Sequence, residues 1–181
     1  YYYTCIMSNI KYQKLDPIQH IHHRPDMYVG DIRVIDHPSE WVLSDNKIEK
    51  KEVKYSDGLI RIFVEAVSNA IDNVWRSKNT ETPCTKIKVN ISEKSVSVWN
   101  DGLAITIEQN EFSNDNGKKT KIYNPELIFG HLLSGSNYDD TEERFTSGRN
   151  GLGIKLTNVF SKEFEIDVYD PVNMKRFRKR W

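Results

Sequence analysis

Residues 59–76 read LIRIFVEAVSNAIDNVWR, and this stretch carries the strongest structural signal in the chain. At a helical advance of about 100° per residue, its polar residues fall on one narrow stripe. That stripe consists of Glu65, Asn69, Asp72, Asn73 and Arg76. The opposite face is apolar and consists of Ile60, Phe63, Ala66, Val67, Ala70, Ile71 and Val74. The pattern predicts an amphipathic helix whose apolar face packs on a core.

The choice of polar residues on this stripe also points to chemistry. Asn and Asp are poor formers of helix interiors, whereas a solvated face usually carries Lys, Glu and Gln. Amide oxygens suit a hard cation such as Mg²⁺, and a carboxylate can act as a general base. The stripe therefore offers what a phosphate and Mg²⁺ site needs. A polar exterior without chemistry is the alternative interpretation of the stripe taken alone.

Composition indicates one ordinary globular domain. The 181 residues are 38% hydrophobic and 29% charged, and 26 Lys and Arg balance 26 Asp and Glu. The net charge therefore argues neither for nor against a nucleic-acid partner. No run approaches the roughly 18 apolar residues of a transmembrane helix, so we expect no membrane partner. The two cysteines, Cys5 and Cys84, form no disulfide framework, which is typical of a reducing, intracellular compartment.

Further elements can be placed from periodicity and helix-boundary residues. We expect helices at 18–23, from 124 through 133, and from 153 to 160. Alternation predicts a hairpin of 87–91 with 96–98, a last strand over 164–168, and a strand-like basic run at the end of the chain. Residues 31–57 suggest short strands and loops, and 110–121 suggest a polar loop. This mixture predicts an α+β fold, a two-layer sandwich of helices on one face of a mixed, mostly antiparallel sheet.

Two other segments could contact a nucleotide. Residues 148–155, GRNGLGIK, form a glycine-rich loop that opens onto a helix, where backbone N–H groups and Lys155 could meet phosphates. Asp101-Gly102 follows a strand, so its carboxylate could accept a hydrogen bond from an adenine amino group. Taken alone, the first is equally consistent with a surface loop, and the second with a tight turn.

The order of these three elements resolves the ambiguity. A helix with Glu65 and Asn69, then Asp101-Gly102, then Gly151-x-Gly153 before a helix resembles the GHKL ATPase superfamily. Residues 24–31, RPDMYVGD, look like the RPxMYIGD signature of type IIA DNA topoisomerases. Residues 128–140, IFGHLLSGSNYDD, and GRNG at 148–151 are similar to the eukaryotic-type enzymes. The resemblance extends from Tyr12 to Trp181.

The resemblance implies a role for each matching residue. Glu65 would be the general base that polarises water at the γ-phosphate, and Asn69 would hold Mg²⁺. Asn73 would reach the phosphates or ribose, and Asp101 would contact adenine. The full expected nucleotide set is Asn69, Asn73, Asp101, Ile128, Phe129, Ser136, Asn137, Arg149, Asn150, Gly151, Leu152, Gly153, Ile154 and Lys155. Ser136 and Asn137 would act from a lid, and residues 149–155 would wrap the triphosphate with backbone N–H groups.

The family also implies partners and further domains. In it, Mg-ATP closes two such domains into a gate for DNA strand passage, so DNA and a second copy would be partners of the full-length enzyme. We expect residues 1–11 to be an arm segment, with Tyr12 as the best arm candidate, and 12–181 to be the GHKL ATP-binding domain. The chain looks like a fragment without transducer and DNA-cleavage domains. It should bind ATP but hydrolyse it poorly and dimerise weakly. A eukaryotic source would place it in the nucleus.

Departures from the family leave other functions open. Ala104 replaces the second glycine of the DxGxG element, and Gly135 replaces a serine of the lid. A second hypothesis is therefore a nucleotide- or inhibitor-binding module with little turnover. A third, another GHKL ATPase such as a kinase or mismatch-repair protein, is disfavoured by the RPDMYVGD and SNYDD segments. The basic residues from Lys175 to Arg180 could touch DNA or direct nuclear import, or they could be the exposed face of a strand.

Overall fold

The structure, a computed structural model, describes residues 14–113, 118–132, 134 and 151–181. Its helices are α1 (Pro17–His23), the 3₁₀ turn η1 (Pro25–Met27), α2 (Asp57–Ser77), α3 (Asn124–Gly130) and α4 (Gly153–Phe160). Its strands are β1 (Ile35–Ser44), β2 (Lys47–Tyr55), β3 (Ile87–Ile91), β4 (Val96–Asn100), β5 (Gln109–Ser113), β6 (Lys119–Tyr123), β7 (Glu165–Asp170) and β8 (Lys175–Arg180).

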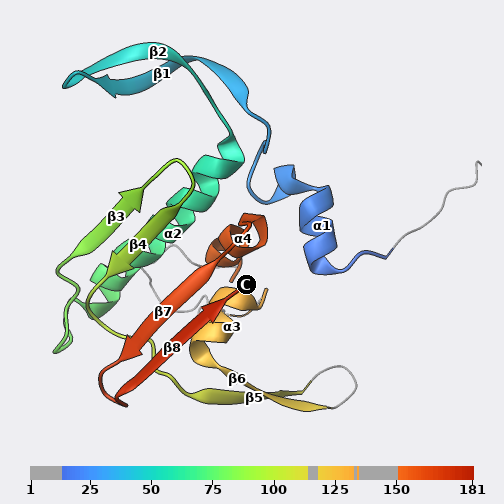
Figure 1. Ribbon diagram of the computed structural model, residues 1–181, viewed down its shortest axis with the longest axis vertical. Helices are drawn as coiled ribbons and strands as arrows, with labels where there is room; N and C mark the ends of the chain where they lie inside the picture. Colours follow the sequence, from blue (N-terminus) through green and yellow to red (C-terminus); the bar gives the residue numbers. More distant parts are fainter. Residues whose placement is uncertain (1–13, 114–117, 133, 135–150) are drawn as a thin grey trace, which may run out of the picture.

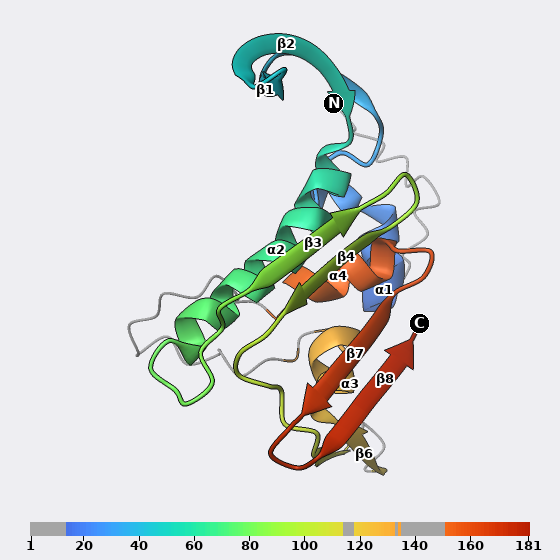
Figure 2. The same cartoon turned by 60° about the vertical axis from the view of Figure 1, so that its left-hand side comes forward.

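Helices and hairpins form two layers. In Figure 2 the hairpins β3–β4 and β7–β8 lie in front of α2, α3 and α4, so the helices cover one side of these strands. Each strand pairs with its neighbour in sequence, and every described pair is antiparallel. The expected α+β architecture is confirmed, with its strands present as four two-stranded antiparallel sheets. No helix among the described residues has both the length and the apolar character needed to cross a bilayer.

The long helix α2 begins where the 24–31 segment anchors it. Ser56 caps the helix by accepting a hydrogen bond from the Leu59 N–H at 3.2 Å. The carbonyl of Asp31 accepts hydrogen bonds from the Ser56 hydroxyl at 3.0 Å and the Gly58 N–H at 2.9 Å. Gly30, just before it, has φ of +91°, a conformation that favours glycine. The signature segment therefore sets the position of α2.

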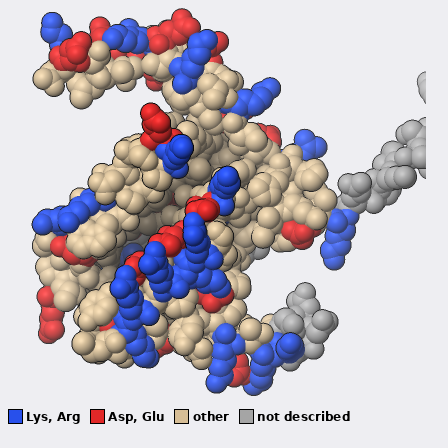
Figure 3. Space-filling model, viewed as in Figure 1, with Lys and Arg blue, Asp and Glu red and all other residues tan. Residues whose placement is uncertain are grey.

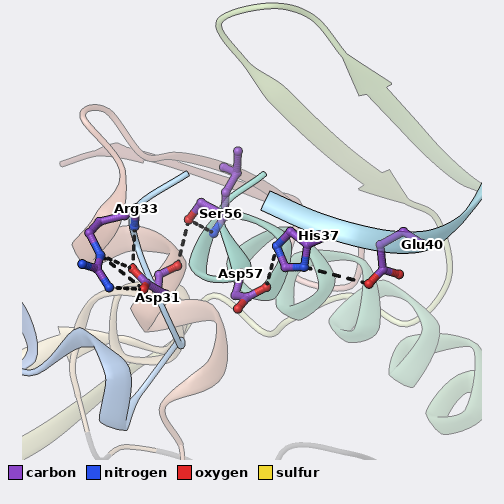
Figure 4. Close-up of polar contacts among 7 residues, drawn as sticks. Asp31, Arg33, His37, Glu40, Ser56 and Asp57 are labelled. Atoms are coloured by element: carbon purple, nitrogen blue, oxygen red, sulfur yellow. Dashed lines mark hydrogen bonds and ion pairs between the residues drawn. The ribbon is translucent and has the colours of Figure 1, made fainter. Parts of the chain in front are cut away.

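Side chains around this anchor form two charged clusters, which Figure 4 shows. The Asp31 carboxylate accepts hydrogen bonds from Arg33, which hold the pKa of that carboxyl at about 2. His37 stacks on Tyr55 with 3.7 Å between ring centroids. Its Nε2 lies 3.6 Å from the Asp57 carboxylate. These contacts join the base of β1 and β2 to the start of α2.

Strands β1 and β2 form a long arm that projects from the body of the molecule (Figure 1). The expectation of short strands and loops over 31–57 is therefore wrong. The arm has solvent on both faces, and Trp41 opposite Lys50 and Leu43 opposite Ile48 are exposed. Without a buried face the sequence shows no regular alternation, which is the signal that identifies a strand.

Two other boundaries differ from expectation. Residues 110–121 are expected to form a polar loop, yet β5 and β6 pair as a hairpin, and almost every residue of these two strands is exposed. Helix α3 ends at Gly130 rather than near residue 133. A Cβ on Gly130 would lie 2.6 Å from Cζ2 of Trp181, so the glycine makes room for that ring. The hairpin β3–β4, helix α4 and the basic strand β8 lie as predicted.

Candidate functional site

Glu65 lies on the face of α2 that turns toward α4. Its side chain is only 19% exposed, and its Oε1 lies 2.7 Å from Nη2 of Arg61, one helical turn earlier. Spacing of four residues places two side chains beside each other on a helix, so this pair follows from the sequence of α2. The ion pair gives the partly buried carboxylate a cation on its solvent side.

Gly153 begins α4 directly against the same carboxylate. A Cβ built on Gly153 would lie 2.1 Å from Oε2 of Glu65, so no larger residue fits without moving that carboxylate. The two helices are fixed further along, where the Thr157 hydroxyl donates to the Ile62 carbonyl at 2.9 Å. The structure therefore brings the predicted base and the glycine loop into contact, as the prediction of one shared site requires.

Asn69 lies one turn after Glu65 on α2. Its Nδ2 donates a hydrogen bond to the Glu65 backbone carbonyl at 3.0 Å. With the nitrogen held by the helix, Oδ1 is the amide atom left to bind a cation. This geometry fits the metal-binding role expected for Asn69.

Asn73, two turns after Glu65, is buried at 6% exposure. Its Nδ2 donates to the backbone carbonyls of Asp101 and Leu103, both at 3.2 Å. It therefore ties α2 to the turn that follows β4. Asn73 therefore has a structural role that the sequence did not predict. Its direct contact with ribose or phosphate stays a prediction.

The Asp101 carboxylate already accepts three hydrogen bonds from the segment before β3. Oδ1 accepts from the Thr85 and Lys86 N–H groups at 2.8 Å each, and Oδ2 accepts from the Thr85 hydroxyl at 2.7 Å. The Thr85 hydroxyl and the Lys86 N–H hold the pKa of Asp101 well below its usual range. A contact with adenine stays a prediction, and it would have to share an acceptor with these donors.

Lys155 turns its ammonium inward. The residue is 4% exposed, and Nζ donates to the carbonyls of Ser134 and, at 2.7 Å, Gly151. Burial lowers the pKa of Lys155 to about 8. Its neighbour Leu152 packs against the buried cluster of Ile21, Val29 and Leu156, so the glycine loop is anchored to the core on both sides of Gly153.

Helix α3 supplies the next part of the predicted set. Ile128 and Phe129 are half-buried, as is Ile154 on α4. The Phe129 carbonyl accepts a hydrogen bond from Asn158 of α4 at 3.0 Å, which sets α3 beside α4. A contact of either α3 residue with nucleotide stays a prediction.

Several expected site residues cannot be placed. Ser136, Asn137, Arg149 and Asn150 lie outside the described residues, as do Gly135 and Tyr12. The structure thus brings together Glu65, Asn69, Asn73, Asp101 and the start of α4, and it leaves the lid contacts as predictions.

Two features of the site were not predicted. Arg61 pairs with Glu65, and the four-residue spacing on the helix could have revealed it. The segment at Thr85 holds Asp101 over a gap of 16 residues, and no local sequence signal predicts such a contact. Beside Arg61 the structure also has an open pocket of about 350 Å³, lined by Val29, Tyr55, Asp57, Ile60, Arg61 and Val64.

The basic run of β8 has acidic partners along its length. Figure 3 shows Lys and Arg gathered over β7–β8 with Asp and Glu among them. Arg176 pairs with Asp167, and Arg178 pairs with Glu165. The run is therefore the charged outer face of a hairpin, and its neutralising carboxylates disfavour a phosphate-binding surface there.

Comparison with known proteins identifies the family. The family model described as "Histidine kinase-, DNA gyrase B-, and HSP90-like ATPase" matches residues 54–174, which include α2, the Asp101 turn and α4. The chain belongs to this ATPase family. Both the fold and the expected arrangement of the site agree with that membership.

Within this ATPase family, the similar proteins are type II topoisomerases. The chain is 46% identical to DNA topoisomerase 2 of Invertebrate iridescent virus 6 and 47% identical to that of Penicillium chrysogenum, over 94% of its own length in each case. It covers only 16% and 10% of these relatives. The crystal structure of the ATPase and transducer domains of DNA topoisomerase II from Balamuthia mandrillaris matches with a TM-score of 0.82 at 40% identity, over 94% of this chain and 41% of that one.

Proposed function

We propose that this chain binds Mg-ATP between α2, the Asp101 turn and the glycine loop, and hydrolyses it with Glu65 as general base. One observation carries the proposal: Gly153, where the glycine loop enters α4, lies directly against the Glu65 carboxylate. A phosphate chain wrapped by the backbone of residues 149–155 would end beside that carboxylate. The base would then lie next to the bond that hydrolysis breaks.

The proposed role of each residue follows from the side-chain oxygens that bonds within the protein leave available. Oδ1 of Asn69 would hold Mg²⁺, which neutralises charge on the phosphate oxygens when bound. The Glu65 carboxylate would accept a proton from the attacking water. Arg61 fixes one oxygen of that carboxylate at 2.7 Å and leaves Oε2 on the side of Gly153. The rest of the predicted nucleotide set would hold adenine, ribose and phosphates as the family resemblance implies.

Action on DNA belongs to the whole protein. The similar proteins are named DNA topoisomerase 2, and this chain corresponds to a small part of each. We propose that Mg-ATP binding drives two copies of this domain together as a gate for DNA strand passage, in the nucleus if the source is eukaryotic. The isolated chain should bind ATP with slow turnover. ATP-dependent strand passage by the full-length protein tests this part of the proposal.

Calorimetric titration with a non-hydrolysable ATP analogue, with and without Mg²⁺, tests the site itself. The full-length protein should bind the analogue more tightly with Mg²⁺, and Asn69→Ala should remove most of that gain, about tenfold or more. Asn90→Ala is the matched control, because Asn90 is an exposed asparagine on β3. Its side chain bonds only to the Ser97 hydroxyl among the described residues. An unchanged Mg²⁺ effect in Asn69→Ala would contradict the metal role.

The same titration, combined with an assay of ATP hydrolysis, separates a binding module from an enzyme. Binding of the analogue without measurable ATP hydrolysis by the full-length protein would favour the module with little turnover, for which Ala104 and Gly135 are the sequence arguments. Absence of any binding would contradict both functions.

A further inference from the structure

Lys155 is a buried cation without an acidic partner among the described residues. Lysine is almost never fully buried unless its charge is paired, because removing an ammonium from water is costly. Here the residue is 4% exposed, and burial alone accounts for its lowered pKa. Its ammonium is instead satisfied by two backbone carbonyls. A buried lysine held in this way points to a role that requires its position.

The two carbonyls come from different parts of the chain. Ser134 follows α3, and Gly151 lies two residues before the start of α4. Nζ of Lys155 bonds to both carbonyls, at 2.7 Å in the case of Gly151. A single ammonium therefore joins the chain after α3 to the glycine loop that enters α4.

These bonds leave little for a phosphate. An ammonium has three donors, and two of them point to the carbonyls. The buried position of Lys155 also differs from that of a lysine that extends into solvent to meet an anion. The sequence alone predicts that the Lys155 side chain adds positive charge beside the phosphates. That prediction accounts for neither of the two carbonyl contacts.

We propose that Lys155 is a positioning residue, whose side chain ties Ser134 to Gly151 and thereby fixes the backbone of residues 151–153 for nucleotide binding. The proposal deepens the proposed function and rests on it for the identity of the ligand. The phosphates would be contacted by backbone N–H groups, and Lys155 would act on them only through the shape of the loop. Its loss should therefore weaken binding through the loop, and more for nucleotides with more phosphates.

Binding of ATP, ADP and AMP to the full-length protein tests the proposal through the Lys155→Met variant. Methionine keeps an unbranched apolar stem and removes the donors. We expect affinity to fall about tenfold for ATP and ADP and less for AMP. Lys162→Met is the matched control, because Lys162 is exposed just after α4 and should change none of them. Unchanged affinity for ATP would overturn the proposal, and so would a loss of affinity without faster exchange of the loop amides, because that would show a direct phosphate contact.

Hydrogen exchange supplies a readout that does not depend on nucleotide. In Lys155→Met, amides of residues 151–156 should exchange faster while those of β3–β4 stay unchanged. If this variant unfolds throughout, Lys155→Gln, which keeps two N–H donors on a shorter side chain, replaces it with the same two expectations. Unchanged exchange at 151–156 would overturn the proposal. If the unaltered protein binds no nucleotide, the proposed function fails, and hydrogen exchange still decides whether Lys155 holds the loop.

Discussion

Gly102 and Gly153 both lie at the candidate site, yet a side chain at each would meet different neighbours. A Cβ on Gly102 would lie 2.6 to 2.8 Å from the Cβ, Cα and N of Cys84, and its φ of +98° disfavours any side chain. A Cβ on Gly153 would meet only the Glu65 side chain. The first glycine is required by the fold around the Asp101 turn. The second is required by the placement of one carboxylate.

The same contrast extends to the residues around each glycine. Near Gly102 the functional side chains of Asp101 and Asn73 are used to build the turn. Near Gly153, the bonds within α2 use Oε1 of Glu65 and Nδ2 of Asn69. Oε2 of Glu65 and Oδ1 of Asn69 accept no hydrogen bond from the described residues. The adenine end of the site is therefore rigid scaffold, whereas the phosphate end presents atoms for chemistry.

Gly102→Ala should have the largest effect on stability. Strain from the positive φ and the contact with Cys84 backbone atoms should lower the free energy of unfolding by about 3 kcal/mol. Chemical denaturation of the variant measures this. A loss below about 1 kcal/mol would show that the turn can relax and would weaken the contrast.

Gly153→Ala should reverse that pattern. The new methyl group should push the Glu65 carboxylate aside, because the end of a side chain moves more easily than backbone. Displacement of a reacting group by about 1 Å can cost ~100-fold in rate. We expect ATP hydrolysis by the full-length protein to fall by about that factor, with a melting temperature within a few degrees of the original. Loss of stability equal to that of Gly102→Ala would contradict the distinction.

Asp101→Asn should have a smaller, pH-dependent effect on stability. The pKa of Asp101 is lowered in the folded state, so its contribution is present above the unfolded pKa of about 4 and is lost as pH falls toward the lowered value. The variant should melt a few degrees lower at pH 7, and the difference should shrink below pH 4. Melting curves from pH 7 to pH 2 measure it. A difference that does not change with pH would mean that charge is not involved.

Lys155 should give the smallest effect, with the same pH direction as Asp101 but in a higher pH range. Its folded pKa of about 8 is below the ordinary lysine pKa of 10.5, so the unfolded chain binds more protons between these values. The stability of the original protein relative to Lys155→Met should therefore rise as pH increases from 8 to 10.5. Comparison of the two proteins removes the effect of other titrating groups. A relative stability that falls over this range would contradict the lowered pKa.

The sequence predicts those parts of the fold that have a buried face or a helix boundary residue. Helices α2 and α4 show clear periodicity because one side of each packs on the body. The hairpin β3–β4 alternates in sequence although Val89, Ile91 and Val96 are exposed. The arm β1–β2 and the hairpin β5–β6 are exposed on most positions. Their strands are held mainly by backbone hydrogen bonds, which leave no pattern of apolar residues to detect.

For the site, the sequence identifies residue types and their order but not how each side chain is used. Spacing on α2 predicts that Glu65 and Asn69 share a face, and the structure brings that face to Gly153. The inward bonds of Asn73, Asp101 and Lys155 could not be predicted. Their partners lie 15 to 30 residues away, apart from the Lys155 bond to Gly151, so only tertiary structure brings them together.

The role of Glu65 is tested most directly by the Glu65→Gln variant of the full-length protein, measured for ATP binding and for ATP hydrolysis. Glutamine keeps the shape of the side chain and cannot accept the proton. We predict hydrolysis reduced by about 100-fold or more, with the dissociation constant for Mg-ATP changed by less than about threefold. Glu163→Gln is the control, because Glu163 pairs with Arg180 on the hairpin surface. Hydrolysis by Glu65→Gln within about threefold of the original rate would contradict a general base at this position.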